Sequence, residues 1–398
     1  MRISTTWQQQ QSVNQMLNRQ YELSQTQLAL GNGKAMQSPS DNPAAAARAV
    51  DVNSASAQND QYTRNINMAN TRLSVEEQSL NSASDVLDRI RTLALEGSNG
   101  TQTDESRKSI AAEMRQNLQQ LVAIANTKDG QGEYVFAGSR TSSQPFTQSD
   151  LGVTYSGDQG QRMVAAGAGI QVATGDSGDD VFMAIRGGNG TFQTAAATTN
   201  TGTGVVGATS VTDASAWTGG SYTITFTDAS NYEIHDAANP TGAPISTGTY
   251  TGTSGVINFN GAQINLTGAP AAGDSFSVTP SSSQDVFSAV AGLITAFETP
   301  GGGAPMNNAV NAQLQNIDQA AGSFLNTRTQ IGARMNTLDQ QASLGSDMKL
   351  QYDSTLSDLQ DLDYASAASK FSQQQSALDA AQQAYVKMQN LSLFNYLK

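Results

Sequence analysis

Apolar residues recur at alternating spacings of three and four along two long segments, from Ile66 to Ala94 and from Leu314 to Leu359. Eight of nine such positions are apolar in the first segment, which Glu76 interrupts, and eleven of fourteen in the second. This spacing is typical of the seam of a coiled coil. We therefore predict two long helices in an antiparallel rod, the second roughly 70 Å long. The residues expected to pack in the rod are Leu73, Leu80, Leu87, Ile90, Ile331, Met335 and Leu338.

Weaker apolar stripes mark both ends of the chain. Near the N-terminus a second stripe, formed by Val13, Met16, Leu23 and Leu30, lies beside the first. A single antiparallel partner cannot bury two faces of a slim helix, so either the ends fray as amphipathic helices or the second face is buried between subunits. We predict burial between subunits. The terminal stripes consist of Ile3, Trp7, Leu17, Tyr21, Leu28, Leu378, Tyr385, Met388, Leu391, Phe394 and Leu397.

Local signals indicate where the helices begin and end. Gly31-Asn32-Gly33 is suited to ending the first helix, because glycine tolerates the left-handed cap position. Ser40-Asp41-Asn42 before Pro43 is typical of a helix start. Residues 97–100 interrupt the next helix, and Thr103 is placed to cap a third one. Residues 299–303, Thr-Pro-Gly-Gly-Gly, form a linker before the C-terminal helix.

The middle of the chain has a different composition and predicts a β-rich insertion. Residues 131–280 contain 24 of the 36 glycines and alternate Thr, Gly and apolar residues, as short strands do. Strands are expected at residues 222–226, 256–259, 263–266 and 275–278, with a tight turn at Asn260-Gly261. The sequence of residues 180–185 is similar to that of residues 285–290, and we call these the echoed segments. The second copy is expected to continue a scaffold that the residues between them interrupt. The predicted fold is mainly α with an inserted β-rich domain.

Composition excludes several classes of function. The chain has no cysteine, which excludes thiol nucleophiles, disulfides and zinc fingers. A single histidine, His235, makes a Ser-His-Asp triad or a multi-histidine metal site improbable, and we expect it to be an exposed polar side chain. The net charge of −13 provides no basic surface for nucleic acid or an anionic bilayer. No apolar run is long enough to span a membrane, and the N-terminus lacks the pattern of a secretory signal.

Three short motifs have some features of chemical sites. Residues 31–34 have the Gly-Lys end of a phosphate loop but lack its first glycine and its Ser or Thr. Asp176, Asp179 and Asp180 lack the spacing of an EF-hand, so a solvated turn is expected rather than a calcium site. Asn99, Asn189 and Asn265 lie in glycosylation sequons, whose use stays open. We therefore predict no catalytic, cofactor-binding or metal-binding residues, and no cofactor.

Motifs at both ends identify a family. Residues 28–50, LALGNGKAMQSPSDNPAAAARAV, resemble the N-terminal signature of flagellins, and Asp88–Ala94 resembles a stretch of their rod domain. Residues 361–365, Asp-Leu-Asp-Tyr-Ala, followed by a helix to the end, resemble the closing flagellin signature. The chain is thus identified as a member of the flagellin family.

Other segments are similar to the hook-associated members of this family. Residues 132–138, Gly-Glu-Tyr-Val-Phe-Ala-Gly, with Pro145-Phe146 downstream, and residues 155–160, Tyr-Ser-Gly-Asp-Gln-Gly, match recurring stretches of such proteins. The final residues 392–397 also resemble a hook-associated protein more than a filament flagellin. The β-rich stretch 222–280 is similar to modules inserted in these proteins. This similarity leaves the role of residues 190–280 open.

The resemblance implies an architecture and a domain organisation. Residues 1–45 with 360–398 are expected to form a terminal coiled coil that lines the inside of a flagellum and becomes ordered on assembly. Residues 46–140 with 285–359 would form the helical rod domain. Residues 141–284 would form a β-rich outer domain that projects outward.

The resemblance also implies a role and partners. The chain would be a structural adaptor at the junction of hook and filament, outside the cell. Its partners would be the first hook-associated protein, flagellin, further copies of itself in a ring or helical layer, and a cytoplasmic export chaperone, with neither nucleic acid nor membrane among them. The flagellar type III channel would export it unfolded. The alternatives are a filament-forming flagellin and, from another class, a secreted enzyme carried on a flagellin-like scaffold.

Overall fold

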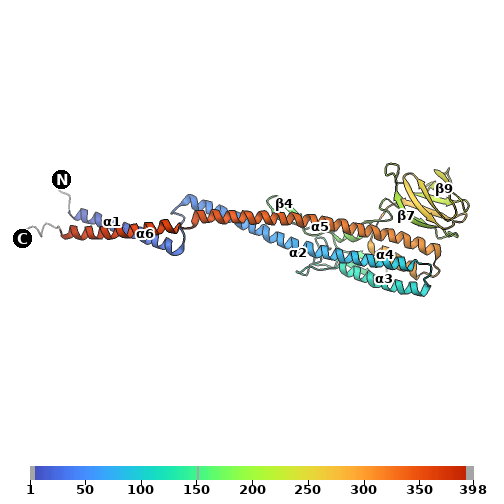
Figure 1. The fold of residues 1–398 in the computed structure, drawn as a ribbon, viewed down its shortest axis with the longest axis horizontal. Helices are drawn as coiled ribbons and strands as arrows, with labels where there is room; N and C mark the ends of the chain where they lie inside the picture. The colour runs from blue at the N-terminus through green and yellow to red at the C-terminus, as the bar shows by residue number, and fades with distance from the viewer. Residues whose placement is uncertain (1–4, 150–151, 391–398) are drawn as a thin grey trace, which may run out of the picture. The chain divides into compact units, whose positions relative to one another are not determined.

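The structure, a computed structural model, describes residues 5–149 and 152–390. The chain forms two compact units, residues 1–64 with 341–398 and residues 65–340. Two long helices, α2 and α5, contribute to both units, and the strands lie between α3 and α4 in the sequence (Figure 1). This confirms the predicted fold class. The helices are α1 (Thr5–Asn32), α2 (Pro43–Gly97), α3 (Asp104–Ala125), α4 (Val286–Glu298), α5 (Gly303–Gln360) and α6 (Tyr364–Asn390).

Helix boundaries follow the local signals in the sequence. Helix α2 begins at Pro43 and ends at Gly97, and α5 begins at Gly303, the last residue of the Gly-rich linker. At the start of α3, the Thr103 side chain accepts a hydrogen bond from the Ser106 amide, while the Ser106 hydroxyl accepts one from the Thr103 amide. This reciprocal capping box satisfies amides that the helix itself leaves unpaired. The predicted starts and stops of these helices are confirmed.

The first unit contains α1 alongside α6, together with the start of α2 and the end of α5. Helix α1 stops where predicted, because Gly33 adopts a φ of +71°, a left-handed conformation that glycine tolerates. The segments after α1 and α5 then pair: the Ala35 amide donates to the carbonyl of Gln360 (2.8 Å), and the Leu362 amide donates to that of Gly33 (2.9 Å). The turn into α6 is therefore tied to the turn out of α1.

In the second unit, the seam of α2 is the centre of the helical core. All nine seam positions from Ile66 to Ala94 are buried, Glu76 included. The seam of α5 is fully buried at Ile317, Phe324, Ile331 and Leu338. Beyond Leu338, in the part of α5 that belongs to the first unit, the seam positions are half-buried or exposed. The apolar seam therefore forms a tight core only in the second unit.

Phe182 and Phe287 join the two echoed segments. Phe182 lies in the short π-helix η1 (Asp179–Met183), Phe287 is the second residue of α4, and their rings stack with centroids 5.9 Å apart. At the end of the first echoed segment, β5 (Ile185–Arg186) pairs with β14 (Ser283–Gln284), which precedes the second echoed segment. The β domain, defined here as residues 187–282, therefore leaves and re-enters the scaffold at one place.

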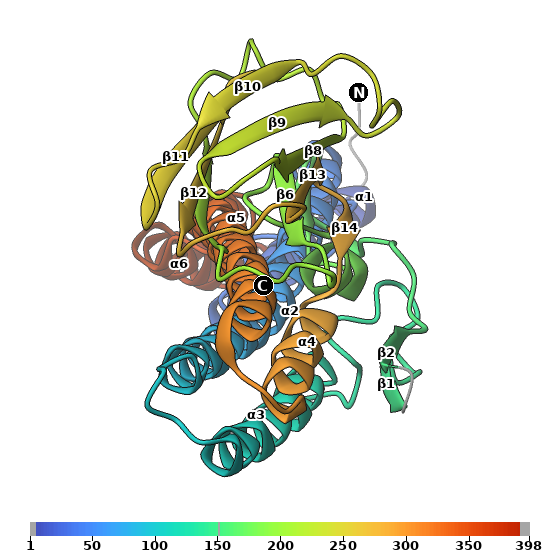
Figure 2. The same cartoon turned by 90° about the vertical axis from the view of Figure 1, so that its right-hand side faces the viewer.

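The β domain consists of two antiparallel sheets (Figure 2). One has the order β10-β9-β8-β13-β6 and the other β11-β12-β7. Their strands are β6 (Phe192–Ala196), β7 (Val205–Val211), β8 (Tyr222–Phe226), β9 (Asn231–Asp236), β10 (Ser246–Thr249), β11 (Ser254–Phe259), β12 (Ala262–Thr267) and β13 (Ser275–Pro280). Two hairpins precede the domain: β1 (Phe146–Ser149) with β2 (Gly152–Tyr155), and β3 (Met163–Gly167) with β4 (Ile170–Ala173).

The inward side chains of the two sheets share one apolar core, which includes Phe226, Ile264 and Phe276. The predicted turn between β11 and β12 is confirmed, since Asn260 and Gly261 have φ values of 43° and 75° and Phe259 pairs with Ala262. Positive φ at both central residues defines the turn type that matches strand twist. All four predicted strands lie within observed strands.

Amide side chains of α5 bind the edge of the smaller sheet. Asn308 accepts from the Val206 amide (2.7 Å) and donates to the carbonyl of Gly204 (2.9 Å). Asn311 donates to the Val206 carbonyl (2.8 Å), and Gln315 to that of Gly207 (3.1 Å). These side chains supply the partners that a further strand would give to β7. We refer to Asn308, Asn311 and Gln315 as the amide ladder.

Candidate functional site: an assembly surface and a buried charge cluster

The terminal stripe on α1 is exposed within the single chain. Trp7, Leu17, Tyr21 and Leu28 are 62%, 58%, 67% and 55% exposed, although α1 packs on α6. The neighbouring stripe, Val13, Met16, Leu23 and Leu30, is half-buried. One face of α1 is thus covered and another is left to solvent. The role of this stripe as an assembly interface remains a prediction.

The C-terminal stripe is described only in part. Leu378 and Tyr385 on α6 are half-buried. Four residues of the predicted interface, Ile3, Leu391, Phe394 and Leu397, lie outside the described residues, and so does the side chain of Met388.

The residues predicted to pack in the rod are gathered in the helical core of the second unit. Six of them are fully buried: Leu73, Leu80, Leu87, Ile90, Ile331 and Leu338; Met335 is half-buried. Polar pairs along the flank of the seam show that α2 and α5 run antiparallel. These pairs are Asp60 with Lys349, Asn70 with Asp339, Glu77 with Arg328, and Arg91 with Asp318.

The two sequence motifs at 132–138 and 155–160 meet in space. The Tyr155 hydroxyl donates to the carbonyl of Asp158 (2.8 Å) and also lies 3.1 Å from that of Phe136. The Asp158 carboxylate accepts from the amides of Ser139 (2.7 Å) and Gly160 (2.9 Å), which hold its pKa below the usual value. Tyr155, Asp158 and Gly160 are thus parts of one folded loop that also includes the 132–138 motif.

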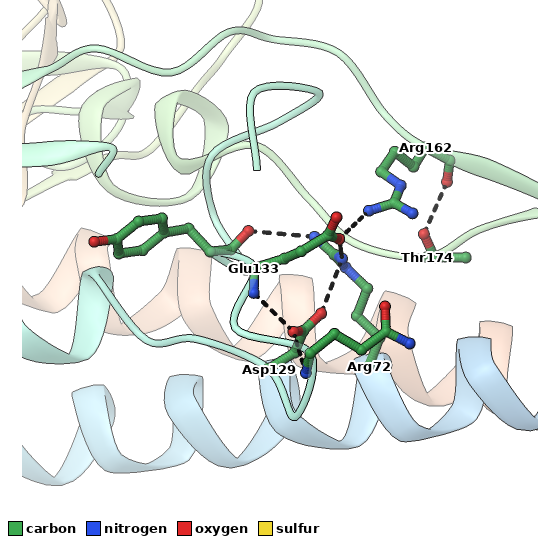
Figure 3. A network of polar contacts seen from close by, with 7 residues as sticks. Arg72, Asp129, Glu133, Arg162 and Thr174 are labelled. Atoms are coloured by element: carbon green, nitrogen blue, oxygen red, sulfur yellow. Dashed lines mark hydrogen bonds and ion pairs between the residues drawn. The ribbon is translucent and has the colours of Figure 1, made fainter. Parts of the chain in front are cut away.

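A group of charged side chains ties this loop to α2. Arg72 is buried on α2 and donates to Asp129 (3.1 Å) and Glu133 (3.0 Å), as Figure 3 shows. Arg162 also donates to Glu133, and Thr174 donates to the Arg162 carbonyl (3.2 Å). The hydrogen bond from Arg162 is the main reason why the pKa of Glu133 is lowered.

The charge cluster continues to α5. Arg334 donates to both oxygens of Asp176, at 2.9 and 2.8 Å, and the Asp176 amide donates to Glu76 Oε1 (2.9 Å). Burial, and then the charge of Asp176, raise the pKa of Glu76 to about 8, so it carries a proton at neutral pH. The cluster then contains three arginines and three carboxylates, Asp129, Glu133 and Asp176. It is therefore electrically neutral while Glu76 is protonated.

Two predictions about polar residues were wrong. Asp176 was expected in a solvated turn, but it is buried because the turn faces Arg334 on α5. His235 was expected to be exposed, but its side chain is only 12% exposed and its Nε2 lies 3.2 Å from Glu233. The only sequence signal for the charge cluster was Glu76, a carboxylate in an otherwise apolar seam.

The described residues contain no group of three or more His, Asp or Glu side chains arranged to hold a metal ion. None of the described helices combines the length and the apolar character needed to cross a membrane.

Comparison with known proteins first defines a class. Residues 3–141 match the bacterial flagellin N-terminal helical region, and residues 314–397 match the flagellin C-terminal helical region. Residues 195–280 match the D2-like domain of flagellar hook-associated protein 1. The helical scaffold is therefore that of a flagellin-like protein, and the inserted domain is of a kind found in a hook-associated protein.

Full-length relatives narrow the assignment. Flagellar hook-associated protein 3 of Escherichia coli K12 is 26% identical, with all of both chains covered. The crystal structure of Xanthomonas campestris FlgL is 35% identical, covering 77% of this chain and 99% of that one, with a TM-score of 0.70. The flagellar junction protein FlgL from Legionella pneumophila is 34% identical, covering 70% and 95%, with a TM-score of 0.64. The chain belongs to the flagellar hook-associated protein 3 family.

Proposed function

We propose that this chain is the structural adaptor that joins the flagellar hook to the flagellin filament outside the cell. Relatives matched over nearly their whole length bear the names hook-associated protein 3 and flagellar junction protein, which supports this role. The observation that carries the proposal is the apolar stripe of Trp7, Leu17, Tyr21 and Leu28, exposed on a flagellin-type terminal helix.

The energetics of the stripe favour assembly. Full burial of a large apolar side chain contributes about 1.5–3 kcal/mol, so four such residues per subunit stabilise a contact substantially. A single α1–α6 pair does not realise this contribution, because α6 leaves the stripe exposed. Burial of the stripe therefore favours binding of each subunit to neighbours that present helices of the same type.

The two kinds of matched region suggest two neighbours. The flagellin-type ends support flagellin as the partner on the filament side. The D2-like match supports the first hook-associated protein on the hook side. Further copies of this chain would complete the ring or helical layer between them. Unfolded export through the flagellar type III channel, aided by a cytoplasmic chaperone, is part of the proposal, and a chain without cysteine forms no disulfide that would obstruct it.

The proposed function of the molecule is structural rather than catalytic. Apart from the protonated Glu76, the titratable groups of the charge cluster are engaged in ion pairs within the scaffold. The secreted-enzyme alternative would need a substrate site in the β domain, whose inward side chains instead form a closed apolar core.

Deletion of the gene tests the adaptor role. We expect intact hooks without filaments, with flagellin released into the medium, and restoration of filaments by the full-length chain supplied in trans. Normal filaments in the deletion strain, with no related gene present, would contradict the proposal.

Assembly in vitro distinguishes an adaptor from a filament flagellin. Purified adaptor should add to the ends of hook or filament seeds and then stop. Purified flagellin should elongate the same seeds without limit. Long filaments grown from this chain alone would favour the flagellin alternative.

A further inference from the structure

Two buried polar atoms within the charge cluster have no hydrogen-bond partner among the described residues. They are Nε of Arg72 and Oε2 of Glu76. The two residues are 7% and 0% exposed, so bulk water does not reach these atoms. A buried polar atom without a partner costs about 1–3 kcal/mol, and two such atoms side by side indicate a ligand that binds both.

Gly175 marks the place where this ligand would lie. A Cβ atom built on Gly175 would be 3.5 Å from Glu76 Oε2, 3.7 Å from Arg72 Nε and 3.7 Å from the carbonyl oxygen of Val135. Polar atoms from α2 and from the loop thus surround one point beside the glycine. A cavity of about 10 Å³, lined by Arg72, Val135 and Gly175 among others, borders this glycine.

The size and chemistry of the site select the ligand. About 10–15 Å³ is the space that one water molecule needs. Arg72 Nε–H is a donor and the Val135 carbonyl is an acceptor, so the ligand must both accept and donate. A cation would be repelled by the guanidinium of Arg72, and a halide ion could not donate to the carbonyl.

The protonation state of Glu76 completes the pattern of donors. Glu76 Oε1 accepts from the Asp176 amide, so the proton of the neutral acid belongs on Oε2. A water molecule at the site would then accept from Arg72 Nε–H and from Glu76 Oε2–H, and would donate to the carbonyl of Val135. Three hydrogen bonds are what a buried structural water typically makes.

We propose that one water molecule is a structural component of the second unit, held by Arg72 Nε, Glu76 Oε2 and the carbonyl of Val135. It joins the seam of α2 to the loop that carries the 132–138 motif. Gly175 is required there because any side chain would occupy the position of the water. This proposal does not depend on the proposed adaptor function.

The substitution Gly175→Ala tests the proposal. The added methyl group makes only ordinary van der Waals contacts, but it displaces the water and leaves the polar atoms without a partner. We expect the Tm to fall by about 3 °C or more. Gly207→Ala is the matched control, because its Cβ likewise makes only ordinary van der Waals contacts, the nearest at 3.7 Å, and it should leave the Tm unchanged or raise it.

A high-resolution crystal structure of the full chain gives a second, independent readout. We expect electron density for one water within hydrogen-bond distance of all three atoms, and loss of that density in Gly175→Ala. Two results would overturn the proposal: no density at the site in the parent chain, or a direct hydrogen bond between Arg72 Nε and Glu76 Oε2. Equal Tm values for Gly175→Ala and Gly207→Ala would also count against it.

Discussion

The guanidinium of Arg334 on α5 holds the carboxylate of Asp176 by two parallel hydrogen bonds of 2.9 and 2.8 Å, across 158 residues of sequence. Both side chains are mostly buried, so solvent screens the pair weakly. The pair connects α5 to the segment that leads into η1. It is therefore a long-range link within the second unit.

Removal of Arg334 should destabilise the second unit strongly. Arg334→Met leaves Asp176 as an unpaired buried carboxylate, and we expect a loss of about 3–5 kcal/mol in the free energy of unfolding. Urea denaturation of the full chain measures it. Adding Asp176→Asn should recover part of the loss, because the neutral amide needs no counter-charge. A loss below about 1 kcal/mol in the single variant would show that the pair contributes little.

Glu76 should make the stability of the second unit depend on pH. Its pKa is raised from 4.5 to about 8 in the folded chain, so between these values the folded state keeps a proton that the unfolded state releases. The contribution of Glu76 to stability is therefore greatest below pH 4.5. It falls by about 1.4 kcal/mol per pH unit up to about pH 8, and then levels off.

The variant Glu76→Gln isolates this effect. The amide resembles the protonated acid and does not ionise, so the variant should gain stability over the parent chain as the pH rises from 5 to 8. Unfolding by urea at several pH values measures the difference. The exposed Glu96→Gln is the control and should follow the parent chain. Parallel curves for Glu76→Gln and the parent would refute the prediction.

Substitutions in the terminal stripe should spare folding and impair assembly. Leu17 and Tyr21 are exposed, so changing both to serine should alter the stability of the monomer by no more than about 0.5 kcal/mol per site. Incorporation at the hook tip should nevertheless be lost. Circular dichroism of the monomer and filament counts in a complemented deletion strain measure the two effects. Gln20→Ser with Gln27→Ser, on exposed positions of the same helix, should leave assembly intact.

Loss of two members of the amide ladder should loosen the β domain without unfolding it. Asn311→Ala with Gln315→Ala removes three hydrogen bonds to β7, one of them donated by the Thr209 hydroxyl to Gln315. We expect faster hydrogen exchange in β7 and an unchanged rate in the seam of α2. Asn307→Ala, on the same helix and without a described bond to β7, controls for the change in helix propensity. Unaltered exchange in β7 would mean that the apolar core alone holds the strand.

Features governed by short-range patterns were predictable from the sequence. The seam of α2 follows from apolar spacing, and the hairpin at Asn260-Gly261 from the backbone preference of those residues. The capping of α3 by Thr103 needs only the next three residues. In each case the chemistry that decides the structure lies within a few residues along the chain.

Features that depend on distant partners were not predictable. The sequence around Asp176 is that of an open turn, and Arg334 is part of a polar helix face; only the fold brings them together. Asn308, Asn311 and Gln315 have the composition of an ordinary solvated helix surface, yet they bind the backbone of a strand about 100 residues earlier. The exposed stripe of α1 was predictable as a pattern, and its burial against another chain remains a prediction.

The pairing of β5 with β14 has a consequence for how such proteins diversify. Because the two ends of residues 187–282 are adjacent in one two-stranded ladder, a cassette of any length whose own termini lie close together can be grafted there. The helical core need not change to accommodate it. The inserted domain can therefore change in evolution independently of the helices. Selection on the contacts of the helices with their neighbours acts separately.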